Sequence, residues 1–198
     1  PVDGPLGMCD FWGRDISGRN LLIVGAGRIG FAVACRSIGW GMKVGYVARS
    51  RHAEFEHAPL CARRMNLDDG LAWADFVSVH VPLNENTRHL INESSLKTMK
   101  NTAVLVNTAR GPVIDESALV RALQSGEIYA AGLDVYENEP RLHPGLYNLD
   151  NVVLSPHVGS ATEKHRLQMT EIIAENLRQY SRGERPPTCL NWDEVRKS

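Results

Sequence analysis

Short apolar runs alternate with segments of helical periodicity along most of the chain. Apolar runs rich in β-branched residues predict strands at residues 20–24, 42–47, 61–65, 76–80, 103–107, 128–134 and 152–154. Apolar residues spaced three and four apart predict helices at residues 28–39, 93–99 and 116–125, and another that ends near residue 73. Crossovers between parallel strands are right-handed and place helices on both faces. The order therefore predicts an α/β fold with a doubly wound parallel sheet.

A longer helical pattern follows the last predicted strand, at residues 161–182. Ser160 and Glu163 have capping-box spacing at its start, and Gly183 follows its end. One apolar stripe runs along it, formed by Leu167, Thr170, Ile173, Ala174 and Leu177. Residues 184–191 have no periodicity, which predicts an extended tail.

The charge balance and the cysteines narrow the class of protein. The chain has 198 residues, with 22 Lys and Arg against 23 Asp and Glu, and a formal net charge of −1. This balance argues against binding to nucleic acid or to a membrane surface, because both need a surplus of basic residues. The four cysteines include no C-x-x-C pair, so they predict neither a disulfide framework nor a metal site. Arg28 and Arg36 interrupt the longest apolar stretch and no signal-peptide pattern opens the chain, so we expect a soluble, cytoplasmic protein.

A glycine-rich turn joins the first predicted strand to the first predicted helix. Gly25, Gly27 and Gly30 match the pattern G-x-G-x-x-G. The first glycine allows a tight turn, the second lets the backbone approach a pyrophosphate, and the third lets the helix pack closely on the strand. Arg28 and Ile29 stand at the helix N-terminus, whose free N–H groups attract phosphate. In this context the motif predicts a Rossmann-like NAD(P)-binding domain.

The end of the second predicted strand indicates which dinucleotide to expect. NAD-specific sites carry Asp or Glu about 20 residues after the glycines, where the carboxylate binds the ribose 2′-hydroxyl. No acidic residue stands between Phe31 and Ala53, and Arg49, Ser50 and Arg51 follow the strand instead. Two cations and a hydroxyl suit a 2′-phosphate. We therefore expect NADP(H) to be preferred, with NAD(H) and an ordinary solvated basic loop as the alternatives.

Polar residues follow three later strands, at the sheet edge where ligands of doubly wound folds bind. Arg110 follows the strand at 103–107, Glu139 the next one, and His157 the last one. An arginine can bind a carboxylate with two parallel hydrogen bonds, and histidine is the usual general acid or base near neutral pH. Each of the three also has a structural explanation, as a helix cap, a turn residue or an ordinary histidine. Strand ends alone leave both interpretations open.

Several motifs together resemble one known family. They are VHVPLNENTR at 79–88, VNTARGPVIDE at 106–116, GLDVYENEP at 132–140 and SPHVGSAT at 155–162. In this order they resemble the signatures of the D-isomer-specific 2-hydroxyacid dehydrogenases, and the resemblance runs from about residue 5 to residue 191. The GRIG turn, the GSAT ending and RGERPPT at 182–188 are most similar to the glyoxylate/hydroxypyruvate reductase branch.

The resemblance implies a role for each strand-end residue. In this family a hydride passes between nicotinamide and C2 of a small 2-oxo or 2-hydroxy acid. Arg110 would bind the substrate carboxylate, Glu139 would orient His157, and His157 would protonate the forming alkoxide. Asp134 would hold the nicotinamide carboxamide. The resemblance also implies cofactor contacts at Val81, Pro82, Thr87, Thr108, Ala109, Arg110, His157 and Gly159.

The resemblance also implies a domain organisation. Family members begin with a separate substrate-binding domain of roughly a hundred residues, and only a short stretch precedes Gly25 here. We expect residues 1–185 to form the NAD(P)-binding domain and residues 186–198 a tail that returns to the substrate-binding domain. Alone, this part is expected to bind cofactor and turn over poorly. We expect a homodimer, with Phe11 and Trp12 packed in the core or against a partner subunit.

Two rival functions remain open on the sequence. Phosphoglycerate dehydrogenase belongs to the same family and is disfavoured by the missing acid after the second strand. A dinucleotide-sensing interaction protein, like the transcriptional corepressors of the family, can keep a similar set of polar residues. The presence of Arg110, Glu139 and His157 favours an enzyme without excluding the sensor.

Overall fold

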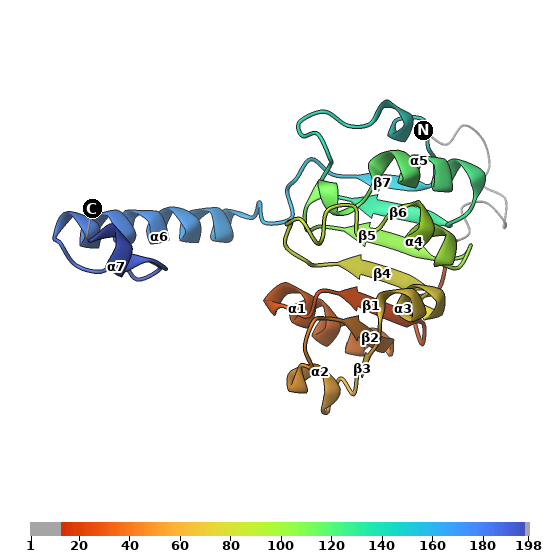
Figure 1. Ribbon diagram of the computed structural model, residues 1–198, viewed down its shortest axis with the longest axis horizontal. Helices are drawn as coiled ribbons and strands as arrows, with labels where there is room; N and C mark the ends of the chain where they lie inside the picture. The colour runs from red at the N-terminus through yellow and green to blue at the C-terminus, as the bar shows by residue number, and fades with distance from the viewer. Residues whose placement is uncertain (1–12, 197–198) are drawn as a thin grey trace. The chain divides into compact units, whose positions relative to one another are not determined.

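The computed structural model describes residues 13–196, and their central feature is one seven-stranded sheet. The strand order is β3-β2-β1-β4-β5-β6-β7, and every neighbouring pair is parallel. Figure 1 shows the arrowheads of the strands at the same edge of the sheet. The predicted doubly wound parallel sheet is confirmed. Phe11 and Trp12 lie outside the described residues.

Apart from α6, the elements have ten residues or fewer. The strands are β1 (Asn20–Val24), β2 (Lys43–Val47), β3 (Arg63–Arg64), β4 (Phe76–Val79), β5 (Val104–Asn107), β6 (Ala130–Leu133) and β7 (Val152–Leu154). The α-helices are α1 (Arg28–Ser37), α2 (Ala53–Glu56), α3 (Leu67–Trp73), α4 (Glu93–Thr98), α5 (Glu116–Ser125), α6 (Glu163–Ser181) and α7 (Trp192–Val195). Single 3-10 turns are η1 (Ile38–Trp40), η2 (Gly111–Val113) and η3 (Pro144–Leu146).

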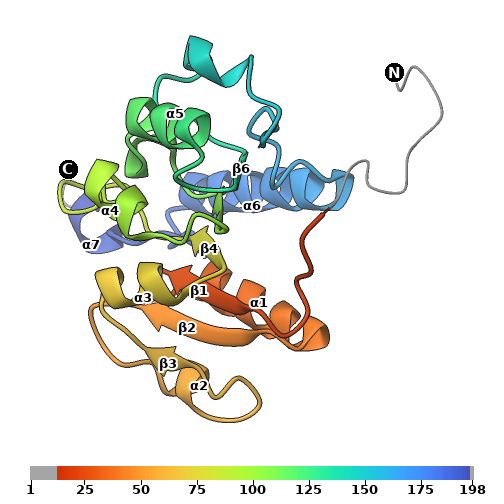
Figure 2. The same ribbon diagram turned by 90° about the vertical axis from the view of Figure 1, so that its right-hand side faces the viewer.

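Strand β1 contributes side chains to a hydrophobic core on each face of the sheet. Leu22 and Val24 belong to a cluster with buried residues of α3, α4 and α5. Leu21 and Ile23 belong to a second cluster, with buried residues of α1 and α2. Because successive strand residues point to opposite faces, a strand that is apolar throughout can be buried on both sides. Figure 2 shows α1 on one side of the sheet and α3 and α4 on the other.

The chain divides into two compact units, between His157 and Val158. The sheet and the helices α1 to α5 belong to the first unit, and α6 and α7 to the second. In the second unit the rings of Tyr180 and Trp192 meet edge to face, with their centroids 6.4 Å apart. None of the described helices is both long and apolar enough to cross a membrane.

The second unit differs from the sequence prediction at the start of α6. Thr162 caps this helix, because its hydroxyl accepts the backbone N–H of His165 at 3.3 Å. The predicted cap at Ser160 is wrong: Ser160 instead accepts the backbone N–H of Thr162 through its carbonyl oxygen, in a turn before the helix. Both residues carry a hydroxyl, so local spacing did not distinguish them. Helix α7 has no counterpart in the prediction.

Candidate active site

The turn between β1 and α1 has a backbone that only glycines permit. Gly25 has a φ of +108°, and a Cβ added there would lie 2.7 Å from the carbonyl carbon of His80. A Cβ on Gly30 would lie 2.2 Å from the carbonyl oxygen of Gly25, so glycine is what allows α1 to approach β1. A Cβ on Gly27 would meet nothing within 4 Å, so the space beside this backbone is open.

The N-terminus of α1 is arranged to receive an anion. Gly27 caps the helix without a side-chain hydrogen bond, and the first turn holds no acidic residue. Arg28 and Ile29 stand exposed in that turn. Unpaired N–H groups and the positive end of the helix dipole favour a phosphate group here. The loop lies where the strand order reverses, between β1 and β4, which is the ligand position of doubly wound sheets. A dinucleotide pyrophosphate therefore fits this loop.

His80, directly after β4, is a half-buried titratable group next to the glycine turn. Its Nε2 lies 2.8 Å from the hydroxyl oxygen of Ser78. Burial lowers the pKa of His80 to about 4, because the charged imidazolium would lose its hydration. The side chain is therefore neutral at physiological pH.

This burial predicts a loss of stability in acid. In the unfolded chain His80 is protonated below about pH 6.5, whereas in the folded chain it is protonated only near pH 4. Between pH 6.5 and pH 4 the unfolded chain therefore binds the proton more tightly, and the stability of the fold decreases as the pH drops. Both the wild type and His80→Gln are expected to lose stability between pH 7 and pH 4. The loss in the free energy of unfolding should be smaller in His80→Gln, by about 3 kcal/mol. Urea unfolding at both pH values measures this, with exposed His57→Gln as the matched control. An equal fall in wild type and His80→Gln would contradict it.

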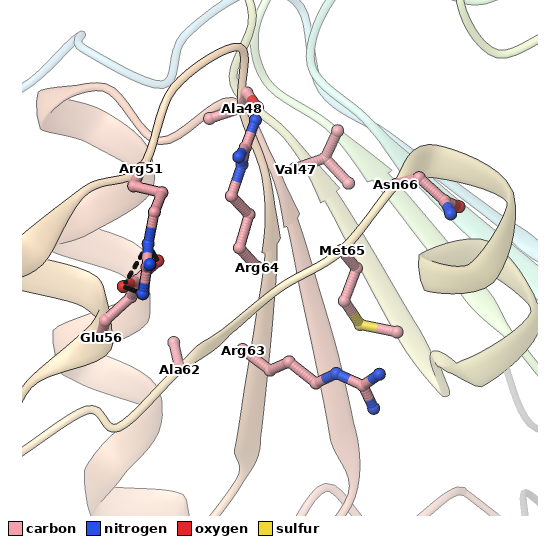
Figure 3. A pocket seen from close by; sticks show the side chains of 9 residues that line it. All are labelled: Val47, Ala48, Arg51, Glu56, Ala62, Arg63, Arg64, Met65 and Asn66. Carbon is pink, nitrogen blue, oxygen red and sulfur yellow. Dashed lines mark hydrogen bonds and ion pairs between the residues drawn. The ribbon is translucent and has the colours of Figure 1, made fainter.

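A cavity of about 790 Å³ lies at the carboxyl end of β2. It is lined by Val47, Ala48, Arg51, Glu56, Ala62, Arg63, Arg64, Met65 and Asn66 (Figure 3). Three of these residues are arginines and one is acidic, so the lining is cationic overall. The sequence predicted Arg51 at this place and missed Arg63 and Arg64.

Arg51 is already paired with an acid. Its Nη2 lies 2.6 Å from Oε2 of Glu56, and its Nε donates to the same carboxylate. The Tyr46 hydroxyl also donates to Glu56, at 2.6 Å. The hydrogen bonds from Arg51 and Tyr46 lower the pKa of Glu56 to about 2, so this carboxylate stays ionised. Arg51 is therefore held by Glu56 while its side chain stays exposed, and Arg49 and Ser50 are exposed as well.

Arg64 reaches the loop that follows β2. Its Nη2 donates to the carbonyl oxygen of Ala48 at 3.1 Å and to that of Arg49 at 2.8 Å. Figure 3 shows its side chain extending to Ala48, while Arg63 extends in another direction. These bonds place the guanidinium of Arg64 against the backbone of the predicted phosphate-binding residues. Strand β3 has only two residues and lies within the strand predicted at residues 61–65, but that prediction did not indicate a role for Arg64.

His157 and Glu139 form a directly hydrogen-bonded pair after β7 and β6. Nδ1 of His157 lies 2.8 Å from Oε2 of Glu139, and the backbone N–H of Tyr136 donates to Oε1 of Glu139 at 2.9 Å. Burial raises the pKa of Glu139, but the hydrogen bonds from His157 and Tyr136 and the charge of Arg110 together lower it below its ordinary value. The imidazole is half exposed, at 50%. A fixed, solvent-accessible imidazole beside an ionised carboxylate can act as a general acid or base.

Arg110 lies at the end of β5, in a loop that a buried asparagine holds. Nδ2 of Asn107 donates to the carbonyl oxygen of Arg110 at 3.0 Å, and Oδ1 of Asn107 accepts the N–H of Ala109. Asn107 is 1% exposed, while the Arg110 side chain is in solvent. The sequence missed Asn107, although a polar residue closing an apolar strand was a signal. The structure thus brings Arg110, Glu139 and His157 to one edge of the sheet.

The turn after β4 holds three of the other predicted cofactor residues. The Thr87 hydroxyl donates to the carbonyl oxygen of Pro82 at 2.6 Å and accepts the N–H of Asn84. Val81 packs against the larger core cluster, and Pro82 is exposed. The Thr87 side chain therefore closes its own turn.

The remaining predicted residues occupy different environments. Asp134 is 6% exposed and accepts a hydrogen bond from the Ser155 hydroxyl. Thr108 is exposed and Ala109 is half-buried, both in the loop that leads to Arg110. Gly159 belongs to the second unit. In residues 13–196 no group of three or more His, Cys, Asp or Glu side chains is placed to hold a metal ion.

Comparison with known proteins identifies relatives of the chain. Glyoxylate reductase from Thermococcus onnurineus (strain NA1) is 52% identical over 181 residues, which cover 91% of this chain and 54% of that protein. Glyoxylate reductase from Pyrococcus horikoshii is 48% identical over 186 residues, which cover 94% of this chain and 55% of that protein. The chain therefore spans about half the length of the curated relatives it matches.

Solved structures agree with these sequence matches. A glyoxylate reductase from Paecilomyes thermophila matches with a TM-score of 0.79 and 44% identity, over 84% of this chain and 50% of that one. A D-isomer specific 2-hydroxyacid dehydrogenase from Lactobacillus delbrueckii ssp. bulgaricus, in its NAD complexed form, matches with a TM-score of 0.80 and 34% identity, over 91% and 58%. The family model described as "D-isomer specific 2-hydroxyacid dehydrogenase, NAD binding domain" matches residues 7–159. The glycine turn and the strand order agree with this sequence match. The chain therefore belongs to the D-isomer-specific 2-hydroxyacid dehydrogenase family and comprises its NAD-binding domain.

Proposed function

We propose that the full-length protein reduces a small 2-oxo acid, glyoxylate or hydroxypyruvate, with a reduced nicotinamide dinucleotide. The observation that carries this proposal is the His157–Glu139 pair, which lies at the same sheet edge as Arg110 and the glycine turn. The relatives in both comparisons include proteins named glyoxylate reductase, which supports the choice of substrate.

Each residue has a defined task in this reaction. The guanidinium of Arg110 binds the substrate carboxylate and lies near the 2-oxo oxygen, where negative charge develops. The bound nicotinamide supplies the hydride to C2. His157 donates its proton to the resulting oxygen, while Glu139 holds the ring in place through Nδ1.

Turnover tests this function directly. The full-length protein is expected to oxidise NADPH when glyoxylate or hydroxypyruvate is added, with a kcat in the ordinary enzyme range of about 1 to 1,000 per second. The absorbance of the reduced nicotinamide measures the rate. Absence of turnover with every 2-oxo acid tried would contradict the proposal and favour a dinucleotide sensor.

We also propose that NADP(H) is preferred over NAD(H), with the 2′-phosphate in the cavity at the end of β2. The cationic lining supports this, because Arg64 is fixed against the loop that carries Arg49 and Ser50. Glu56 is the one carboxylate of the lining, and Arg51 neutralises it. The cavity therefore keeps a net positive charge toward a phosphate.

Removal of Arg64 provides the test. Arg64→Met is expected to weaken NADPH binding by about 10-fold to 100-fold, because one charge-assisted hydrogen bond to phosphate is lost, and to leave NADH binding nearly unchanged. Lys43→Met is the control, since it removes one positive charge at the opposite end of β2, outside the lining of the cavity. Calorimetric titration of the full-length protein with both cofactors measures the effect. Equal losses for NADPH and NADH, or equal losses in the two variants, would contradict this role.

Three further properties are proposed from the family resemblance. The complete protein has a substrate-binding domain, and residues 1–185 serve as its NAD(P)-binding domain, with residues 186–198 as the tail. The protein is a homodimer and is located in the cytoplasm. The dimer is supported by the apolar side chain of Val153 on edge strand β7, because this side chain is 73% exposed. Sedimentation of the full-length protein tests the dimer, and a monomer at micromolar concentration would contradict it.

A further inference from the structure

Two acidic residues next to the catalytic pair exchange hydrogen bonds with each other's backbone. Glu116 is the first residue of α5 and is 5% exposed, and Glu137 lies in the loop after β6. The N–H of Glu116 donates to Oε2 of Glu137 at 3.3 Å. In return, the N–H of Glu137 donates to Oε2 of Glu116 at 3.3 Å. Each carboxylate therefore satisfies a backbone donor of the other residue's segment.

These two segments are the ones that carry Arg110 and Glu139. The chain passes from Arg110 through the 3-10 turn η2 to Glu116, and Glu137 precedes Glu139 by two positions. The segments also touch directly, because a Cβ on Gly111 would lie 1.9 Å from the carbonyl carbon of Tyr136. The same residue, Tyr136, donates its N–H to Glu139. A displacement of the Glu137 backbone would thus move the donor that orients Glu139.

The charges of the two carboxylates are compensated differently. Oε1 of Glu137 lies 2.6 Å from Nε2 of His89 and 3.2 Å from Nη2 of Arg88. Its Oε2 receives an N–H of the first turn of α5, where the helix dipole favours a negative charge. Oε1 of Glu116, by contrast, has no hydrogen-bond partner among the described residues. Burial raises the pKa of Glu116, which favours its neutral form. The hydrogen bond from the Glu137 N–H needs an acceptor oxygen at this position, which a neutral side chain can also supply.

We propose that Glu116 and Glu137 are positioning residues for the reaction, and that their reciprocal hydrogen bonds hold the Glu139 loop against the Arg110 segment. Neither residue is assigned a contact with substrate or cofactor. Both act through Glu139, whose carboxylate must meet Nδ1 of His157. The inference rests on the proposed reduction of a 2-oxo acid by Arg110 and His157.

Three variants of the full-length protein test the role of Glu116. Glu116→Met keeps the length of the side chain and removes the acceptor, Glu116→Gln keeps the acceptor without the charge, and Leu123→Ala destabilises the far end of the same helix. Glu116→Met is expected to lower kcat by about 10-fold, as small misplacements of catalytic groups do, with the cofactor dissociation constant unchanged. Glu116→Gln is expected to restore the wild-type kcat. Leu123→Ala is expected to lower the melting temperature and leave the kcat of the folded protein unchanged.

Hydrogen exchange provides a readout that does not depend on activity. Mass spectrometry of residues 135–141 is expected to show faster exchange in Glu116→Met than in Glu116→Gln or Leu123→Ala. If Glu116→Met does not fold, Glu137→Ala removes the other acceptor at a less buried position and should give the same changes.

The outcomes separate this inference from the proposed function. A wild-type kcat in Glu116→Met, an equal loss in Glu116→Gln, or unchanged exchange of the loop would overturn the positioning role. A wild-type protein that reduces no 2-oxo acid would overturn the proposed function instead. In that case the exchange measurement still decides whether the pair holds the loop.

Discussion

Changing His157 to asparagine is expected to lower kcat for 2-oxo acid reduction by about 1,000-fold, because the forming alkoxide loses its proton donor. The half-exposed imidazole is fixed by Glu139 through Nδ1, which leaves its other nitrogen available to substrate. Cofactor affinity should change little, since the glycine turn and the cavity at β2 are formed by other residues. Single-turnover oxidation of NADPH and a parallel cofactor titration measure the two quantities.

Glu139→Gln tests the residue that orients His157. Glutamine retains an oxygen that can accept the Tyr136 N–H but removes the negative charge beside His157. We expect a loss of about 10-fold to 100-fold in kcat, smaller than that of His157→Asn. A His157→Asn protein that keeps more than about a tenth of the wild-type kcat would show that the proton comes from elsewhere.

Changing Gly30 to alanine is expected to weaken cofactor binding by about 100-fold, or about 2.7 kcal/mol. A Cβ there would lie 2.2 Å from the carbonyl oxygen of Gly25 and 2.9 Å from Cγ2 of Ile23, so α1 must move away from β1. That movement displaces the N–H groups that face the pyrophosphate. The same overpacking is expected to cost about 1 to 3 kcal/mol of folding stability. Calorimetric titration and urea unfolding measure both effects.

Gly27→Ala separates binding from stability in the same turn. Its Cβ would meet nothing within 4 Å, so the free energy of unfolding should change by no more than about 1 kcal/mol. The methyl group would nevertheless occupy the open space that a pyrophosphate needs, so affinity should still fall. If Gly30→Ala binds cofactor like the wild type, the glycine turn is not the phosphate site.

The sequence predicted the parts of the fold whose signals are local and repeated. Strand Asn20–Val24 is apolar and buried from its second residue onward, and α5 begins and ends at the predicted residues Glu116 and Ser125. The glycine turn could be predicted because neighbouring backbone leaves no room for a side chain at Gly25 and Gly30. This constraint places glycines at a fixed spacing that can be recognised in the sequence. Short elements gave weaker signals: α2, with four residues, was not predicted, and β3 has only two of the five residues predicted for its strand.

The parts of the site that the sequence missed depend on contacts between distant residues. Arg64 reaches the carbonyl oxygen of Arg49 from the neighbouring strand. The bonds between Glu116 and Glu137 join positions 21 residues apart. No pattern of spacing shows that Arg51 is paired with Glu56, although this pairing changes how Arg51 faces a phosphate. The catalytic role of Arg110, Glu139 and His157 stays a prediction.

The most direct test of the account follows the hydride. The full-length protein would reduce glyoxylate with NADPH that carries deuterium at both hydrogen positions of nicotinamide C4, and mass spectrometry would locate the label in the product. The account predicts one deuterium on C2 of glycolate in the wild type, formed far more slowly by His157→Asn. Glycolate without the label, or no glycolate, would contradict the proposal that this NAD-binding domain serves a 2-oxo acid reductase.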